Sequence, residues 1–190
     1  NSGVTVKSTA GDVTVEAGDR IVLAGGATIQ ATASGGDVIL RSGVGDTDGD
    51  GAMSLNGVIQ ANTVDGRVTL DLNAANGATQ AGTGAIVAKG LLLLGTGSAA
   101  SFALDTSTAN DVDNLAASTG AAIEFRDPDG VAIATVGGTA GMTTSGDAVT
   151  VNSPAGTITV DDPVTTLPGT GGGVVLIGSV VVNDMLTAGA

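Results

Sequence analysis

The sequence predicts an all-β protein built as a parallel β-helix (β-solenoid) of about eight short turns. Three observations favour this fold: short apolar runs alternate with polar residues between glycine-containing turns, two stretches repeat at an offset of 30 residues, and no window has a convincing helical period. The stretch nearest to a helical pattern, Thr108 to Ala117, is short and rich in Asn and Asp. Tandem β-sandwich repeats are the alternative fold.

The composition favours thin layers of aliphatic side chains. The chain is 42% apolar, enough for a continuous core, yet it has no Trp, no Tyr and only Phe102 and Phe125. Compact domains of this length usually centre on several aromatic residues. The 32 glycines supply turns, while Thr and Val favour strands. We therefore expect one solenoid segment, residues 1–190, that belongs to a longer repetitive chain.

Short strands are expected in order along the chain. The first four lie at residues 13–15, 20–23, 27–31 and 38–40, and each has apolar residues at alternate positions. IQATASGGDVILRS from Ile29 then aligns with IQANTVDGRVTLDL from Ile59, at an offset of 59 − 29 = 30. Without the six-residue acidic run 46–51 the offset is 30 − 6 = 24, close to the 25 that separates Val13 from Val38.

A unit of roughly 20 to 25 residues with about three strands matches one turn of a parallel β-helix. At a rise of about 4.8 Å per turn, the predicted rod is on the order of 40 Å long. Stacked turns would bury one another's inward side chains. The side chains expected to line this core are Val13, Val15, Ile29, Val38, Leu40, Ile59, Val68 and Leu70.

A row of glutamines is expected on the outer surface. If Ile29 and Ala31 point inward, Gln30 points outward, and so does Gln60 in the second copy. A fainter third copy, GATQAGTGAIVAKG from Gly77, places Gln80 twenty residues after Gln60 and predicts the same orientation for it. The row is interpreted as structural or simply solvated, with a ligand-binding stripe as the alternative.

The strand pattern resembles that of a known class of proteins. GDVTVEAGDRIVLAGGATIQA (11–31), GDVILRS (36–42) and the segment 90–151 are similar to the β-strand repeats of giant bacterial surface exoproteins such as filamentous haemagglutinins. In the last segment the pattern includes an Asn-Asp-Val turn at 110–112, Leu-Ala-Ala at 115–117, an aromatic strand at 123–125 and Thr-Val-Gly-Gly at 135–138. The resemblance implies a secreted, right-handed parallel β-helix that serves as a stalk, fibre or adhesin. It transfers no active-site residues.

The stretch GVGDTDGDGA, residues 43–52, is the candidate metal site. Asp46, Asp48, Asp50 and Gly51 match the start of an EF-hand loop, but Gly57 stands where the bidentate Glu is needed, and strands flank the loop. An EF-hand is therefore excluded. A looser calcium site at Asp46, Asp48 and Asp50 stays open beside a solvated turn, because three close carboxylates repel one another unless a cation or water relieves them.

Other acidic pairs are explained by turn chemistry. Asp127-Pro128-Asp129-Gly130 has Pro and Gly where a β-turn prefers them, and Asp161-Asp162-Pro163 matches the end of a strand. Carboxylate pairs also serve glycosidases and polysaccharide lyases, but the chain has no His, Tyr, Trp or Cys to support such chemistry. We therefore expect a protein that is not an enzyme.

Charge and composition limit the partners. The net charge is 6 − 19 = −13 and the six basic residues are scattered, which argues against nucleic acid and anionic lipid. The longest apolar run, Leu91 to Leu94, is far too short to span a bilayer. An acidic protein of this kind fits an extracellular or cell-surface location on a secreting bacterium.

Two classes of function are expected. The first is a structural stalk or fibre segment. The second is a module whose outer face binds a glycan, a protein or ice, including a host-surface or matrix ligand.

The two ends of the sequence suggest association. Joined head to tail they read MLTAGANSGVTVKS, which resembles IQATASGGDVILRS. The comparison predicts tandem copies in a longer chain or end-to-end self-association.

Overall fold

The computed structural model describes residues 3–73, 76–169 and 171–189. These residues form 19 β-strands and no helix, so none of them belongs to a helix that could cross a membrane. All pairings between the named strands are parallel. The chain is thus a parallel β-solenoid, as the sequence predicts, and not a tandem of antiparallel sandwiches.

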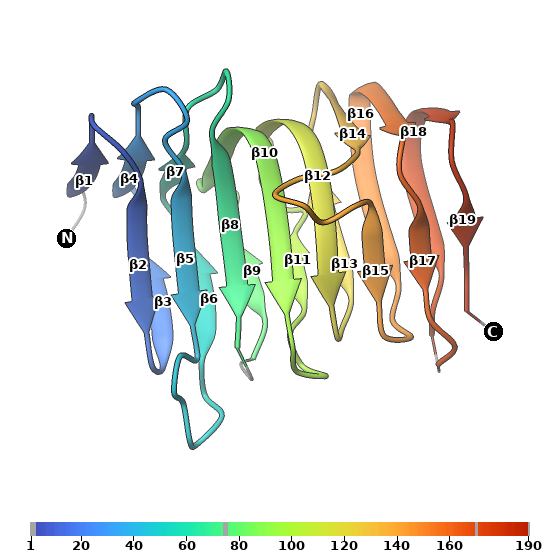
Figure 1. Cartoon of the computed structure of the whole chain (residues 1–190), viewed down its shortest axis with the longest axis horizontal. Coiled ribbons are helices and arrows are strands. Elements are labelled where there is room, and N and C mark those ends of the chain that lie inside the picture. Colours follow the sequence, from blue (N-terminus) through green and yellow to red (C-terminus); the bar gives the residue numbers. More distant parts are fainter. Residues whose placement is uncertain (1–2, 74–75, 170, 190) are drawn as a thin grey trace.

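Three faces run along the solenoid, with its long axis horizontal in Figure 1. Face A consists of β1 (Thr5–Ser8), β4 (Thr28–Ala31), β7 (Val58–Gln60), the first parts of β10 (Ala85–Gly95) and β12 (Asp111–Thr119), β14 (Gly130–Ile133), and the second parts of β16 (Val149–Val160) and β18 (Val174–Val182).

Face B lies toward the viewer in Figure 1. It consists of β2 (Val13–Ala17), β5 (Val38–Ser42), β8 (Arg67–Leu72), the second parts of β10 and β12, β15 (Met142–Thr144), β17 (Val164–Thr166) and β19 (Leu186–Thr187). Face C consists of β3 (Arg20–Leu23), β6 (Ala52–Leu55), β9 (Ala78–Gln80), β11 (Phe102–Leu104), β13 (Ile123–Arg126) and the first parts of β16 and β18.

The solenoid has about seven turns, fewer than the eight expected. Two features account for the difference. The turn that carries the acidic loop is long, since Ile21 pairs with Met53, an offset of 53 − 21 = 32. The last turn is incomplete, because the described residues supply face A from the second part of β18 and face B from β19 but no further strand for face C.

The register confirms the sequence repeat. Ile29 pairs with Ile59 and Val38 with Val68, as the alignment of the two copies predicts. Identical or similar apolar side chains therefore stack in columns along the rod. Seven of the eight predicted core residues are buried, and Val15, in the first turn, is partly buried against the core.

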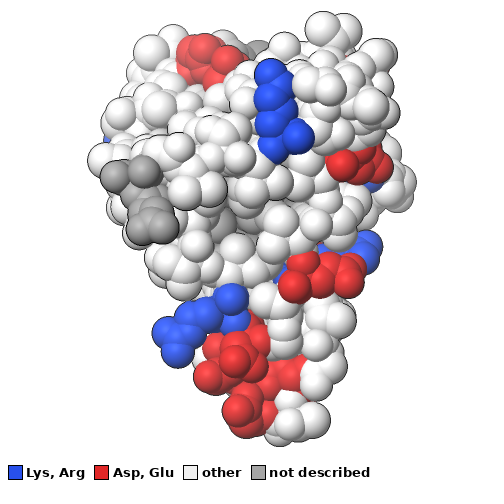
Figure 2. Space-filling model, turned by 90° about the vertical axis from the view of Figure 1, so that its left-hand side faces the viewer, with Lys and Arg blue, Asp and Glu red and all other residues white. Residues whose placement is uncertain are grey.

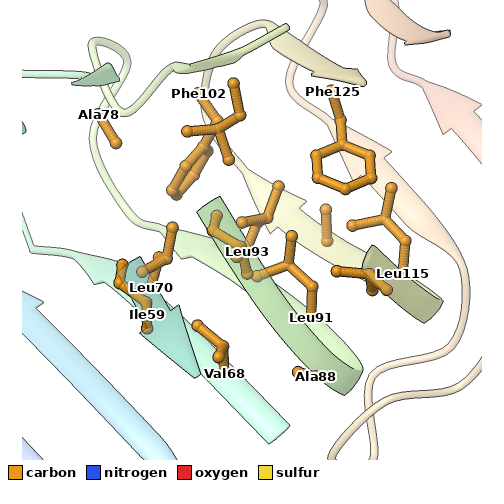
Figure 3. Close-up of a cluster of buried hydrophobic side chains, with 14 of the residues drawn as sticks. Ile59, Val68, Leu70, Ala78, Ala88, Leu91, Leu93, Phe102, Leu115 and Phe125 are labelled. Atoms are coloured by element: carbon orange, nitrogen blue, oxygen red, sulfur yellow. The ribbon is translucent and has the colours of Figure 1, made fainter. Parts of the chain in front are cut away.

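Side chains from the faces converge inside each turn. Figure 3 shows Phe102 and Phe125, from face C, close to leucines of β10 and β12, which are Leu91, Leu93 and Leu115. Both phenylalanines are almost fully buried. The rest of the core is aliphatic apart from two buried methionines, so the expected plan of thin aliphatic layers holds.

The expected orientation of Gln80 is wrong. Gln80 pairs with Leu55 on face C, whereas Gln60 pairs with Val87 on face A. Gln80 therefore occupies an inward position and is buried. Its side-chain amide exchanges two hydrogen bonds with the buried Asn110, of 2.8 and 3.1 Å, which satisfy both groups within the core.

One segment leaves the solenoid and folds back over face B. It comprises residues 134–141, between β14 and β15, and we call it the strap. In Figure 1 it runs across β12 toward β10. Val136 of the strap packs on the outward-facing Leu92 and Ala116, and all three are buried. The strap thus covers an apolar patch that the strand pattern would otherwise expose to water.

The head-to-tail comparison of the two ends is wrong because it aligns strands that belong to different faces. In IQATASGGDVILRS the first strand lies on face A and the second on face B. In the joined ends the order is reversed, because Leu186 belongs to face B and Thr5 to face A. A joined copy would therefore need a further strand on face C. Residues 1, 2 and 190, which would form the joint, lie outside the described residues.

Candidate functional site

The acidic loop, residues 43–51, projects from the end of the solenoid wall between β5 and β6. Figure 1 shows it as the segment that extends furthest below the strands, and Figure 2 shows acidic side chains gathered at this lower tip. The loop is an insertion at one corner of the second turn. Strand pairing on either side of it is regular, since Val15 pairs with Leu40 on face B and Ile21 with Met53 on face C.

Asp46 holds the loop in its turn conformation. Its carboxylate accepts hydrogen bonds from the backbone N–H groups of Asp48, Gly49 and Gly51, at 2.9, 2.9 and 3.0 Å. The bond from Gly49, followed by one with the Asp48 side chain, lowers the pKa of Asp46 to about 2. Asp46 is thus already engaged as a turn-forming residue.

A different carboxylate completes the acidic cluster. Ligand oxygens of Asp19, Asp48 and Asp50 all lie within 4.8 Å of one another, and all three residues are exposed. Asp19 comes from the turn that precedes β3. The hydrogen bond with Asp46 and the negative charge of Asp50 raise the pKa of Asp48. Such a group of oxygens suits a hard cation such as calcium, which takes six to eight oxygen ligands.

The sequence interpretation missed Asp19 because it considered the loop alone. The strand register explains the proximity: Arg20 pairs with Ala52, so the residue before β3 lies beside the end of the loop. The N–H of Ala52 also donates a hydrogen bond to the Asp19 carbonyl, at 3.2 Å. Pairing the expected strand 20–23 with the strand that follows the loop would have predicted that Asp19 lies beside the loop.

The outward glutamine row is shorter than expected. On face A, Lys7, Gln30, Gln60 and Val87 follow one another in register. Two glutamines therefore stand side by side, between a lysine and a valine. This arrangement fits a solvated row on the surface of the rod better than an extended amide ladder.

The remaining acidic pairs lie in turns, as expected, but one of them is unusual. Asp161 and Asp162 follow the end of β16. Asp127, between β13 and β14, is fully buried, and its carboxylate accepts a 2.8 Å hydrogen bond from the N–H of Val112. Burial raises the pKa of Asp127 to about 8, with a contribution from its hydrogen bond with Asp129. Turn statistics gave no signal of this burial.

No protein-family model, no curated protein and no solved structure matches the chain significantly.

Proposed function

We propose that this chain is a rigid rod segment, a stalk or fibre unit of a secreted bacterial surface protein. The observation that carries the proposal is the construction of the two terminal turns. Both present strands on faces A and B, and their inward side chains are apolar but incompletely covered, such as Val6 of β1 and Val180 of β18. A further turn could therefore add at either end with the same strand pairing.

The stacking of the turns and the composition support this role. Each turn rests on its neighbours through parallel strand ladders, which gives a stiff element whose length grows with the number of turns. The chain contains no His, Cys, Tyr or Trp, so a non-catalytic role suits its chemistry. The resemblance to haemagglutinin-like exoproteins and the net charge of −13 fit an extracellular or cell-surface location.

Stiffness can be measured because the chain has no cysteine. Val22 and Val175 are both exposed, and they belong to one outward row of face C. Six pairing steps separate them, through Ser54, Thr79, Ala103, Glu124 and Thr150. At about 4.8 Å per step, their Cα atoms should lie about 29 Å apart.

Spin labels at Val22→Cys and Val175→Cys, measured by pulsed electron resonance, should give a single narrow distance distribution near this value. The same labelled protein in denaturant supplies the broad reference distribution. A broad distribution in native buffer would contradict a stiff spacer.

A second candidate role is ion-dependent stabilisation at the acidic loop. The specific observation is that Asp19 joins Asp48 and Asp50 from a neighbouring turn. A calcium ion there would tie the loop to the wall of the solenoid and relieve the repulsion among the three carboxylates. Because the carboxylates are exposed, binding would be weak, about millimolar as in other extracellular modules.

A further inference from the structure

A polar groove crosses the corner between faces A and B, beside the strap. In the second and third turns, loops 32–37 and 61–66 fill this corner. In the next two turns β10 and β12 pass the corner without a loop, and in the turn after them the strap rises. The result is a hollow with a cavity volume of about 300 Å³, whose floor contains Gly90 and Asn114.

The strap forms one wall of this groove and is held in place. Backbone hydrogen bonds join Val136 and Thr139 in both directions, at 2.9 and 3.0 Å, and the Thr135 hydroxyl donates to Asp162 at 2.7 Å. Two glycines permit its close approach. A Cβ on Gly90 would lie 2.9 Å from a Val136 methyl, and one on Gly137 would lie 2.5 Å from Arg67 Nη1.

Charged groups from β8 and from the loops before β5 and β8 line the groove in fixed orientations. The Asp65 carboxylate accepts hydrogen bonds from Gly35 N–H and from the Ser34 hydroxyl, both at 2.8 Å. Arg67 donates to Asp37 at 2.6 Å and to Thr69 at 3.1 Å. These bonds leave lone pairs on Asp65 free for a ligand that donates hydrogen bonds.

The groove floor supplies groups of both kinds. Lys89 donates to Asp113 at 2.6 Å, and its ammonium has two more hydrogens to donate. The Asn114 amide donates to the Lys89 carbonyl at 3.4 Å, while its own oxygen is an acceptor. This part of the groove thus offers both hydrogen-bond donors and acceptors.

The charges of the groove cancel. Asp37 and Asp65 oppose Arg67 and Lys89, which gives 2 − 2 = 0 in a chain whose net charge is −13. A neutral lining selects neither a phosphate nor a metal ion. A peptide is also disfavoured: the strands beneath the groove use their backbone groups in the ladder, and apolar anchoring is limited to Val136.

We propose that this groove binds a neutral sugar unit of a glycan. A hexose presents several hydroxyl groups, each a donor and an acceptor, and Asp65, Lys89 and Asn114 offer partners of both kinds. The site is open at the surface, so an internal or terminal unit of a polysaccharide can enter. This inference goes beyond the rod function, because a rod needs no such groove.

The test uses the intact chain against an array of neutral, sulfated and sialylated glycans, followed by NMR titration with the best neutral hexose. We expect saturable binding with shifts at Gly90, Asn114 and the strap. Asn114→Ala and Lys89→Met should each weaken binding roughly tenfold, since each removes one hydrogen-bonding group. Lys7→Met is the matched control, because it removes an exposed lysine of face A outside the groove.

Three results would overturn the proposal. They are preference for acidic over neutral glycans, binding that Asn114→Ala and Lys89→Met leave unchanged, and absence of any shift up to about 10 mM sugar. Circular dichroism verifies that the variants fold. The spin-label distance is independent of glycan binding, so failure here can be told apart from failure of the rod proposal.

Discussion

Asp127 is the residue whose ionisation should affect folding most. It is fully buried at a corner of the solenoid and its pKa is raised to about 8, whereas an unfolded chain gives Asp a value of about 4. Between these values the folded state retains a proton that the unfolded state has lost. The free energy of unfolding therefore falls as the pH rises from about 4 to about 8, at a slope of up to ~1.4 kcal/mol per pH unit.

Urea denaturation across this range measures the slope, and Asp127→Asn should remove it. An amide oxygen can still accept the hydrogen bond from Val112, so the variant is expected to fold and to gain stability at pH 8. Asp129→Asn is the control on the same turn. Equal slopes in the Asp127→Asn variant and the parent protein would show that Asp127 does not remain protonated.

Ile59 provides the corresponding test of the core. Its side chain is fully buried in the column between Ile29 and Ile86. Ile59→Asp would place an unpaired charge there and should cost several kcal/mol, of the order at which many domains unfold. Gln60→Asp, on the outward side of the same strand, should change the free energy of unfolding by less than about 0.5 kcal/mol. Similar losses in both variants would contradict the assigned faces.

Strand alternation predicted most inward residues because each strand has a period of two. The orientation of Gln80 was predicted wrongly because the third copy was aligned with two strands of face A. Its strand, β9, lies on face C, where the register places Gln80 at the inward position that follows Leu55. Its partner Asn110 comes from a different turn, thirty residues away. A reciprocal buried pair of this kind depends on the stacking of turns, which no single repeat reveals.

Among the elements, the acidic loop allows a direct test of calcium binding. If an ion binds, calcium should raise the melting temperature and a chelator should reverse the effect. Asp19→Asn combined with Asp50→Asn should abolish the response, because both carboxylates belong to the cluster.

Asp46→Asn is expected to act differently. It should weaken the loop with or without calcium, because Asp46 holds the turn through backbone hydrogen bonds. A melting temperature that is insensitive to calcium would make the loop a solvated turn. The sequence alone located this loop, but only strand pairing could add Asp19 to it.

The position of the strap over face B is a feature that the sequence did not predict. Leu91 to Leu94 is a continuous apolar run, so alternation gives no reason for an outward leucine to be covered. Leu92 is covered because residues 134–141 return across β12. The Thr-Val-Gly-Gly motif was recognised, yet its position over a strand two turns earlier in the stack follows from the fold.

The solenoid as a whole has a consistent direction, since all named strands pair in parallel and each complete turn repeats faces A, B and C. The number of turns was overestimated because loops such as the acidic insertion lengthen individual turns without adding strands. The architecture was predictable from local patterns. The relation of the two ends was not, because it depends on which face each terminal strand occupies.

End-to-end association is the prediction that belongs to this scale. Val180 and Leu186 occupy inward positions after Ile158 and Val164, but they remain 38% and 40% exposed in the last turn. Water-exposed apolar layers and open strand edges favour addition of another turn. Where two copies meet, the described residues supply no strand for face C between β19 of one copy and β1 of the next. We therefore expect elongated particles whose length increases with protein concentration.

Light scattering and electron microscopy of the intact chain measure this association. Val180→Lys with Leu186→Lys should abolish it, because the lysines would have to be buried between stacked turns without partners. Folding of the single chain should be nearly unaffected, since both side chains reach water. Val64→Lys is the matched control, as Val64 lies on a loop and is 77% exposed. Single chains at about 100 μM, a concentration well above a micromolar dissociation constant, would contradict self-association and leave covalent continuation as the way such a rod extends.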